Sequence, residues 1–278
     1  MTEDTNLEVV VCPACGASIS AHYCAECGER RFDRSRHTVG HFITELTRFV
    51  TELDSRFLRS FALLLARPGF LTRERIAGRS KKYLSPFALF AIANLAFFFA
   101  QPLANINTFN STLKMQQRDY LHTPIVRAQV EQHVAAGSVD ESAFHDRYDD
   151  VSEDIAKSLI ILQVPIFALL LTLIRARSES LLFDHLVWST HFYAFQLLLN
   201  TVITVGVFVY FKFGGNDFSL ALPALAATFA YIFVALRVAF GDRYWVVTLR
   251  SIALVVAFGL VIEFYRFLLF LITFTVVT

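Results

Sequence analysis

Long apolar stretches dominate this chain from residue 84 onward, and they constrain its fold more than any other feature. A helix needs about 20 mostly apolar residues to cross the roughly 30 Å hydrocarbon core of a bilayer. The 278 residues are 55% hydrophobic, include 29 phenylalanines and have a mean hydropathy of +0.50. We therefore expect an all-α integral membrane protein with about five transmembrane helices, preceded by an amphipathic helix and a small N-terminal module.

The five predicted spans form a membrane domain at residues 84–278, and they lie at about 84–103, 158–174, 186–211, 218–239 and 246–276. Pro86 near the start of the first span suits a helix N-terminus. The last stretch is long for an upright span, and Glu263 and Arg266 interrupt it. We expect it to tilt, to bend, or to combine one span with a short interfacial piece.

The charge distribution predicts the orientation in the membrane. Residues 28–83 carry 13 Lys/Arg against 6 Asp/Glu, whereas residues 104–157 carry 5 against 9. Cytoplasmic flanks are rich in Lys and Arg, so we expect a cytoplasmic N-terminus, an extracytoplasmic loop at 104–157 and a location in the inner (cytoplasmic) membrane. The acidic start of the chain is unlike a signal peptide. The basic segment 73–82 is expected to contact anionic lipid headgroups.

A basic linker and an amphipathic helix are predicted within residues 31–83. Apolar side chains recur there at helical spacing and share one face: Phe42, Ile43, Leu46, Phe49, Val50, Leu53, Phe57, Phe61 and Leu64. Pro68-Gly69 would end this helix. Its apolar face is expected to lie in the lipid interface or to pack on the membrane bundle.

Every cysteine of the chain lies in two C-x-x-C-G motifs, formed by Cys12 with Cys15 and by Cys24 with Cys27. The two-residue gap lets both thiolates of a motif reach one ion about 2.3 Å away, and the following glycine permits a tight turn. Four thiolates suit tetrahedral zinc. We therefore predict a structural zinc ribbon at residues 1–30, in which the metal stabilises a module too small for its own core.

Other roles for the four cysteines are less favoured. Two disulfides would need an oxidising compartment, whereas the basic segment that follows predicts the reducing cytoplasm. A thioredoxin-like pair would need a βαβ domain, which so short a segment does not supply. An iron centre or a redox role stays open as the alternative to zinc.

Ionisable residues inside predicted spans are candidates for function because they are costly in a bilayer. Glu263 and Arg266 are three residues apart on one helix face, and Asp184 and His191 share a face of the third span, with His185 displaced from it. An ion pair facing the bundle would explain the first pair without a function. Interhelical hydrogen bonds would explain the second group in the same way.

The basic segment does not point to nucleic acid, because its place beside a span favours anionic lipid instead. The chain contains no Walker loop, no dinucleotide fingerprint and no H-E-x-x-H motif. The sequence therefore offers no recognisable catalytic motif.

Three segments together resemble a bacterial membrane family known as domain of unknown function 3667. They are the paired cysteine motifs with Tyr23-Cys24, the stretch from Leu53 to Phe87 that contains "RPG" and "GRSKKYLSPF", and "DHLVWSTHFYAF" at Asp184–Phe195. The resemblance implies an integral membrane protein with an N-terminal zinc ribbon. It implies no activity.

Three functions are compatible with these features. The first is a non-enzymatic interaction or regulatory membrane component whose cytoplasmic zinc ribbon binds a protein partner. The second is a small transporter or channel subunit that uses Glu263, Arg266, Asp184 and His191. The third, ranked last, is a membrane enzyme with His185 or His191 as acid or base, which would require a carboxylate beside the histidine in a pocket.

Overall fold

The computed structural model describes residues 10–11, 17–19, 25–26, 56–77, 82–104, 111–118, 120–135, 141–176, 180–213 and 220–278. The chain divides into two compact units, Met1–Asp54 and Ser55–Thr278. In the first unit, strands β1 (Val10–Val11) and β2 (Ser18–Ile19) pair antiparallel, with Val10 opposite Ile19. The predicted cysteine ligands and most of the amphipathic segment lie outside the described residues.

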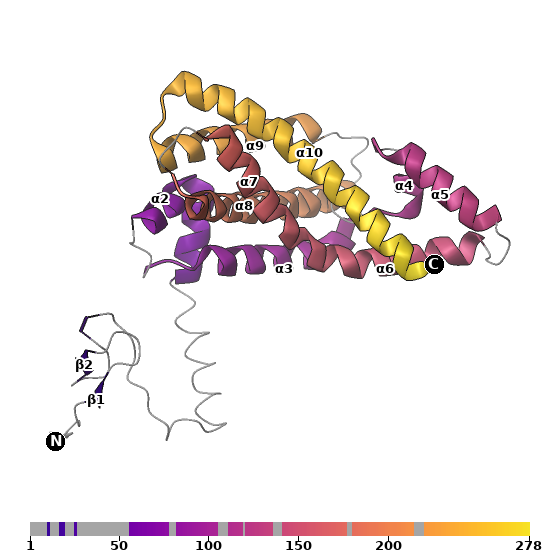
Figure 1. Cartoon of the computed structure of the whole chain (residues 1–278), viewed down its shortest axis with the longest axis horizontal. Coiled ribbons are helices and arrows are strands. Elements are labelled where there is room, and N and C mark those ends of the chain that lie inside the picture. Colours follow the sequence, from indigo (N-terminus) through magenta and orange to yellow (C-terminus); the bar gives the residue numbers. More distant parts are fainter. Residues whose placement is uncertain are drawn as a thin grey trace. The chain divides into compact units, whose positions relative to one another are not determined.

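The second unit is helical throughout its described part (Figure 1). Residues 56–66 are helical and precede α2 (Phe70–Ile76). The remaining helices are α3 (Pro86–Ala104), α4 (Leu113–Gln116), α5 (Thr123–Ala135), α6 (Glu141–Leu159), the 3-10 turn η2 (Ile160–Leu162), α7 (Gln163–Ile174), α8 (Leu182–Lys212), α9 (Ala221–Phe240) and α10 (Tyr244–Val277). Helix α8 packs along α3 and α7, and α10 packs along α6, α7 and α9.

Four helices are long and apolar enough to cross a membrane, which identifies the chain as a membrane protein. They are Ser142–Ile174, running from α6 through α7, and then α8, α9 and α10. The apolar part of α3, Pro86–Gln101, is shorter than these four. The all-α membrane fold is therefore confirmed, whereas the predicted count of five spans is not.

Pro165 explains the irregular turn between α6 and α7. A proline has no N–H to donate, and its ring clashes with the carbonyl four residues earlier, here that of Ile161. The chain passes this point through η2, a single 3-10 turn. The helix that contains the second predicted span therefore begins earlier in the sequence than residue 158. The candidate span starts at Ser142, because α6 continues through η2 into α7.

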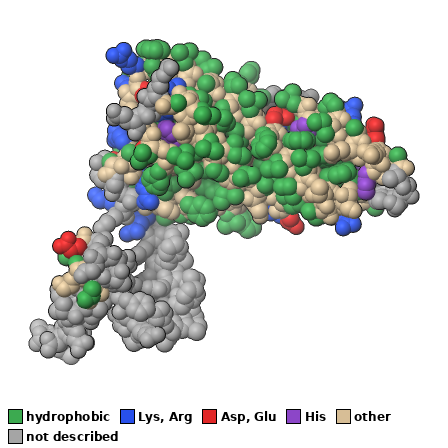
Figure 2. Space-filling view, viewed as in Figure 1, with side chains coloured by type: hydrophobic (Ala, Val, Ile, Leu, Met, Phe, Trp, Pro, Cys, Tyr) green, Lys and Arg blue, Asp and Glu red, His purple; other side chains and the backbone are tan. Residues whose placement is uncertain are grey.

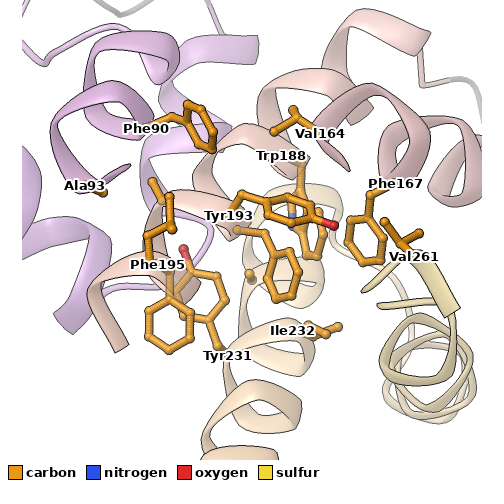
Figure 3. Packing of buried hydrophobic residues seen from close by; sticks show 14 of the residues in the cluster. Phe90, Ala93, Val164, Phe167, Trp188, Tyr193, Phe195, Tyr231, Ile232 and Val261 are labelled. Atoms are coloured by element: carbon orange, nitrogen blue, oxygen red, sulfur yellow. The ribbon is translucent and has the colours of Figure 1, made fainter. Parts of the chain in front are cut away.

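Aromatic side chains fill the centre of the bundle (Figure 3). The Phe167 ring stacks on the Phe192 ring at 5.0 Å and lies edge-on to Tyr193 at 5.7 Å between centroids. Phe195 of α8 stacks on Tyr231 of α9 at 3.8 Å. Aromatic pairs of this kind add about 0.5–1.5 kcal/mol each beyond their area burial, so this core fixes how α7, α8 and α9 pack.

A second, smaller core lies where α10 meets α4, α5 and α6. Its buried members are Leu113, Val126, Val130, Phe144, Tyr148, Phe270 and Val277. The segment expected as a loop at 104–157 therefore contains helices α4 and α5 and most of α6. We call α4, α5 and the first half of α6 the cap, because they pack on the far end of α10.

Helix α10 is one continuous helix of 34 residues. At about 1.5 Å per residue it is ~51 Å long, so it exceeds the ~30 Å hydrocarbon core. Exposed Tyr244 and Trp245 begin it, and such aromatic residues favour the membrane interface. Glu263 lies nineteen residues after Tyr244, which places it ~28 Å along the helix, near the opposite interface. The last predicted span is therefore one span whose end extends into the cap.

Hydrophobic side chains cover much of the face of the bundle that Figure 2 shows. Exposed side chains on α10 recur every three or four residues: Leu249, Ile252, Val256, Leu260 and Phe264. A continuous apolar face of this kind is unfavourable in water and favourable in lipid. Lys and Arg side chains gather at the α2 end of the unit in the same view.

Candidate functional site

The five ionisable residues predicted as functional candidates fall into separate contacts, with Asp184 at the start of α8. Its Oδ2 accepts a hydrogen bond from the backbone N–H of Leu181 at 3.1 Å. A carboxylate in the first turn of a helix also complements the positive end of the helix dipole. Asp184 therefore stabilises the beginning of α8.

His191 lies about two turns after Asp184 on α8 and is buried, with 4% of its surface exposed. Its Nδ1 is 2.9 Å from Oγ1 of Thr72 on α2. The two residues are 119 positions apart in the sequence. This contact joins α2 to the bundle, and it leaves His191 without a carboxylate partner among the described residues.

Gly69, directly before α2, allows the chain to approach α9 closely. Gly69 has φ of 81°, a conformation that L side chains rarely adopt. A Cβ at this position would lie 2.4 Å from the backbone oxygen of Ala235. The "RPG" element of the sequence thus ends the preceding helix and also docks α2 against α9.

His185 has a different partner from His191. Its Nδ1 is 2.9 Å from Oγ1 of Thr172 on α7, and its ring packs edge-on against Phe240 at 5.7 Å. Neither histidine lies in a pocket with a carboxylate among the described residues. The requirement stated for an acid–base enzyme is therefore not met by the described part of the chain.

The sequence analysis missed an ionic cluster that links two turns at this end of the bundle. Asp242 accepts hydrogen bonds from Arg175 and, at 2.5 Å, from Nη1 of Arg250. Arg175 is 3% exposed, and its guanidinium lies over the Phe240 ring at 4.0 Å. Burial lowers the pKa of Arg175, and Asp242 opposes that shift by favouring the charged form. The cluster forms because the turn after α7 lies beside the turn between α9 and α10. Arg175 and Asp242 are 67 positions apart in the sequence, so no local pattern indicates their contact.

Glu263 and Arg266 lie at the other end, where α10 meets the cap. Nη1 of Arg266 is 3.5 Å from Oε1 of Glu263, and its guanidinium lies 4.5 Å from the centre of the Tyr120 ring. The backbone N–H of Leu121 donates to Oε2 of Glu263 at 3.4 Å. The two residues form an ion pair, but the pair contacts the cap, whereas the sequence led us to expect contact with the transmembrane bundle.

His122 completes this cap contact. Its Nε2 is 2.5 Å from Oε1 of Gln116, and its Nδ1 is 3.9 Å from Oε2 of Glu263. Burial lowers the pKa of His122, Glu263 raises it, and Arg266 lowers it further. Gln116 Nε2 also donates to the backbone oxygen of Arg266 at 3.2 Å. Together these bonds attach the 111–123 segment to α10.

A pocket of about 470 Å³ lies between α2, α3, α7 and α8. It is lined by Arg75, Ser85, Pro86, Phe87, Phe90, Ile161, Leu162, Val164, Pro165, Phe183, Leu186, Val187 and Thr190. Its volume is in the usual range for small-molecule sites. None of the five predicted intramembrane candidates lines it. The pocket is therefore separate from the five residues that the sequence predicted as functional candidates.

Two of the polar groups in this pocket already have partners. Ser85 Oγ accepts the backbone N–H of Ala88 at 3.2 Å and caps α3, while Thr190 Oγ1 donates to the carbonyl of Leu186 at 2.7 Å. Arg75 is half-buried and makes no hydrogen bond or ion pair within the described part of the chain. In the sequence Arg75 was one of five basic residues before a span, and nothing distinguished it from the other four.

The predicted metal ligands cannot be placed, because all four cysteines lie outside the described residues. Strand β1 ends directly before Cys12, and Ala25-Glu26 form a turn between Cys24 and Cys27. Among the residues that are described, no group of three His, Cys, Asp or Glu side chains could hold a metal ion. The zinc site remains a prediction from spacing.

Comparison with known proteins adds one family. A family model described as "Protein of unknown function (DUF3667)" matches residues 54–98. No curated protein and no solved structure matches the chain. The matched segment covers helical residues 56–66, α2 and most of α3. It therefore contributes both Thr72, which contacts His191, and Arg75, which lines the pocket.

Proposed function

We propose that this chain is a non-enzymatic, multi-pass component of the inner membrane that acts in interaction or regulation. In this proposal its N-terminal four-cysteine zinc ribbon lies in the cytoplasm and binds a protein partner. The membrane domain then serves as an anchor that holds the ribbon at the bilayer surface. The family match supplies no activity that would point elsewhere.

The observation that supports this proposal is the separation of the ionisable residues in the apolar helices. Asp184 caps a helix, His191 bonds Thr72, His185 bonds Thr172, and Glu263 pairs with Arg266. A transport path would need several of these groups around one cavity. In the described residues each group instead has a contact within or between structural elements, which removes the main argument for a transporter or channel subunit.

The distribution of basic residues supports a cytoplasmic location for the N-terminal module. Arg175, Arg237 and Arg243 lie at the end of the bundle where Arg175 contacts Asp242, and α2 packs on α8 and α9. Because cytoplasmic flanks are enriched in Lys and Arg, we assign this end of the bundle to the cytoplasm. The reducing compartment then favours thiolates that bind zinc over disulfides.

The test uses the full-length protein purified in detergent, with a variant carrying Cys12→Ser and Cys15→Ser. We expect elemental analysis to find about one zinc ion per wild-type chain and none in the variant, because a closed site needs its four ligands. The variant should still insert in the membrane, and its far-UV circular dichroism should keep the helical signal. Ser18→Ala on the exposed side of β2 is the control.

A pull-down with the same three proteins then tests the interaction. We expect a partner that is retained by the wild type and by Ser18→Ala and lost by the cysteine variant. A wild-type protein that contains no zinc would overturn the metal assignment. A partner retained equally by all three would contradict the ribbon as the binding module.

A further inference from the structure

The pocket between α2, α3, α7 and α8 lies at the basic end of the bundle and extends into its apolar part. Ser85 and Pro86 begin α3, and Phe183 and Leu186 belong to the first turns of α8. The lining residues of this segment, from Pro165 to Ile161, lie ten to fourteen residues before Arg175, which corresponds to ~15–21 Å along the helix axis. The pocket therefore extends from the level of the helix ends to beyond the middle of the ~30 Å hydrocarbon core.

The pocket is open on the outer side of the bundle, which faces lipid. Its apolar members Phe87, Ile161, Leu162, Phe183 and Leu186 are exposed on the outside of the bundle. Phe90, Val164 and Val187 are buried and close its inner side. A hydrocarbon chain could enter such a groove sideways from the bilayer without crossing a polar surface.

The kink at Pro165 helps to form this groove. The 3-10 turn at Ile160–Leu162 replaces regular helix just before the proline. Ile161 and Leu162 of this turn and Val164 and Pro165 of the first turn of α7 line the pocket. The wall facing α3 and α8 therefore lies at the point where the 3-10 turn passes into α7.

The charge of the pocket is positive. Arg75 is its only ionisable lining residue among those described, and no carboxylate lines it. The Ser85 hydroxyl accepts the N–H of Ala88, and its own hydrogen has no acceptor within the described residues. A guanidinium and a hydroxyl at the mouth of an apolar groove complement an anion that carries a hydrocarbon chain.

We propose that this pocket binds an anionic phospholipid of the surrounding bilayer. One acyl chain lies in the groove between α3, α7 and α8. The phosphate forms an ion pair with Arg75 and accepts a hydrogen bond from the Ser85 hydroxyl. This goes beyond the general attraction of basic segment 73–82 to anionic headgroups, because it assigns a single site with an acyl-chain groove. It does not depend on the zinc ribbon.

The experiment measures lipid retention by native mass spectrometry on the full-length protein, delipidated in detergent. The probes are dioleoyl phosphatidylglycerol and dioleoyl phosphatidylcholine, which share their acyl chains and differ in charge. We expect one phosphatidylglycerol to bind about tenfold more tightly than phosphatidylcholine, because the charge-assisted contact is made only by the anionic lipid. Glycerol 3-phosphate alone should not compete, since it lacks the chain.

Two pairs of variants locate the site. Arg75→Gln should reduce phosphatidylglycerol binding about tenfold, whereas Arg73→Gln removes the same charge from an exposed position on the same helix that does not line the pocket. Leu186→Trp should fill the groove and lower retention of both lipids. Leu169→Trp is its control, because Leu169 is exposed on α7 and lies outside the pocket lining.

Equal binding of the two lipids, or equal losses in Arg75→Gln and Arg73→Gln, would overturn the proposal. If Arg75→Gln does not fold, the tryptophan pair decides. Loss of retention in Leu186→Trp but not in Leu169→Trp supports the groove, and equal retention in both rejects it. Competition by glycerol 3-phosphate would indicate a headgroup site without a chain and would also reject the proposal.

Discussion

The two ends of the helical bundle carry ionic contacts of similar chemistry but different surroundings. At the α2 end, Asp242 pairs with two arginines, one of them only 3% exposed. At the cap end, Glu263 and Arg266 remain 27% and 19% exposed, and their closest charged atoms are 3.5 Å apart. The comparison indicates that burial, more than the number of charges, decides how strongly each contact fixes the fold.

Both ends join elements that are distant in the sequence, but at the α2 end the contact of Thr72 with His191 is buried. Thr72 bonds His191, Gly69 lies against Ala235, and the N–H of Leu84 donates to Ser60 Oγ at 3.0 Å. At the cap end the bonds connect the 111–123 segment with α10. We therefore expect substitutions at the α2 end to unfold the bundle and those at the cap end to loosen the cap.

The largest effect is expected for Asp242→Asn. Removing this carboxylate leaves the buried Arg175 charge without its partner, which costs about 3–5 kcal/mol. Glu263→Gln, at the more exposed pair, should cost about 1 kcal/mol or less. Both free energies are measured by unfolding in mixed detergent and dodecyl sulfate, followed by circular dichroism. Equal losses of unfolding free energy in the two variants would contradict the conclusion that burial decides how strongly each contact fixes the fold.

Gly69→Ala should have the second largest effect. An alanine at positive φ costs about 1–2 kcal/mol, and its Cβ would also meet the backbone of Ala235. Gly241→Ala is the matched control, because Gly241 has φ of 73° and nothing within 4 Å of an added Cβ. We expect Gly69→Ala to lose about 1–3 kcal/mol more than the control in the same unfolding assay. The same loss at both positions would show that α2 does not dock closely on α9.

A smaller effect is expected for Thr72→Val, which removes the hydroxyl bonded to His191. A buried ring nitrogen left without a partner costs about 1–3 kcal/mol. Thr248→Val is the control, since the Thr248 hydroxyl is exposed and bonds the carbonyl of Tyr244 on its own helix. Thermal unfolding in detergent compares the two, and an unchanged midpoint in Thr72→Val would argue against a structural role for His191.

The smallest expected effect is a pH dependence at the cap end. Burial lowers the pKa of His122 in the fold, whereas an unfolded histidine titrates near pH 6.5. Between those two values the unfolded chain binds the proton and the folded chain does not. Stability therefore falls as the pH drops below about 6.5, and it stops falling once the folded pKa is passed.

His122→Gln should remove this part of the pH dependence. Limited proteolysis of the cap between about pH 7.5 and about pH 5.5 follows it, because cleavage reports local opening of the 111–135 segment. Wild type should be cleaved faster at the lower pH, and His122→Gln should show a flatter profile. Identical profiles would mean that a group other than His122 causes the pH response.

The sequence predicts the helices of this protein better than the contacts between them. Hydropathy places α8 and α9 almost where they lie, since spans were expected at 186–211 and 218–239. Pro86 is the first residue of α3, as its preference for the helix N-terminus predicts. These features depend on local residue patterns, which a sequence displays directly.

Features that depend on long-range pairing could not be predicted. The residues of α2 were expected to form part of a basic flank. The docking of α2 depends on the close approach of Gly69 to Ala235, which no local pattern in the sequence indicates. The common site of Asp184, His191, Glu263 and Arg266 that the alternative transporter function requires does not form among the described residues, since helical spacing places residues on a face without saying which helix that face meets. Arg75 was recognised for its charge, while the pocket that it lines forms between α2, α3, α7 and α8, which are brought together only in the fold.

The most direct test of the account asks whether water reaches the ionisable residues along one path. His191→Cys, Glu263→Cys and the marker Lys82→Cys are treated in sealed membrane vesicles with an impermeant maleimide, added to either side. Mass spectrometry of the labelled peptide identifies each site in the presence of the native cysteines. The account predicts labelling of Lys82→Cys and Glu263→Cys from opposite sides and of His191→Cys from neither. Labelling of His191→Cys and Glu263→Cys from the same side would reveal a shared aqueous cavity and contradict it.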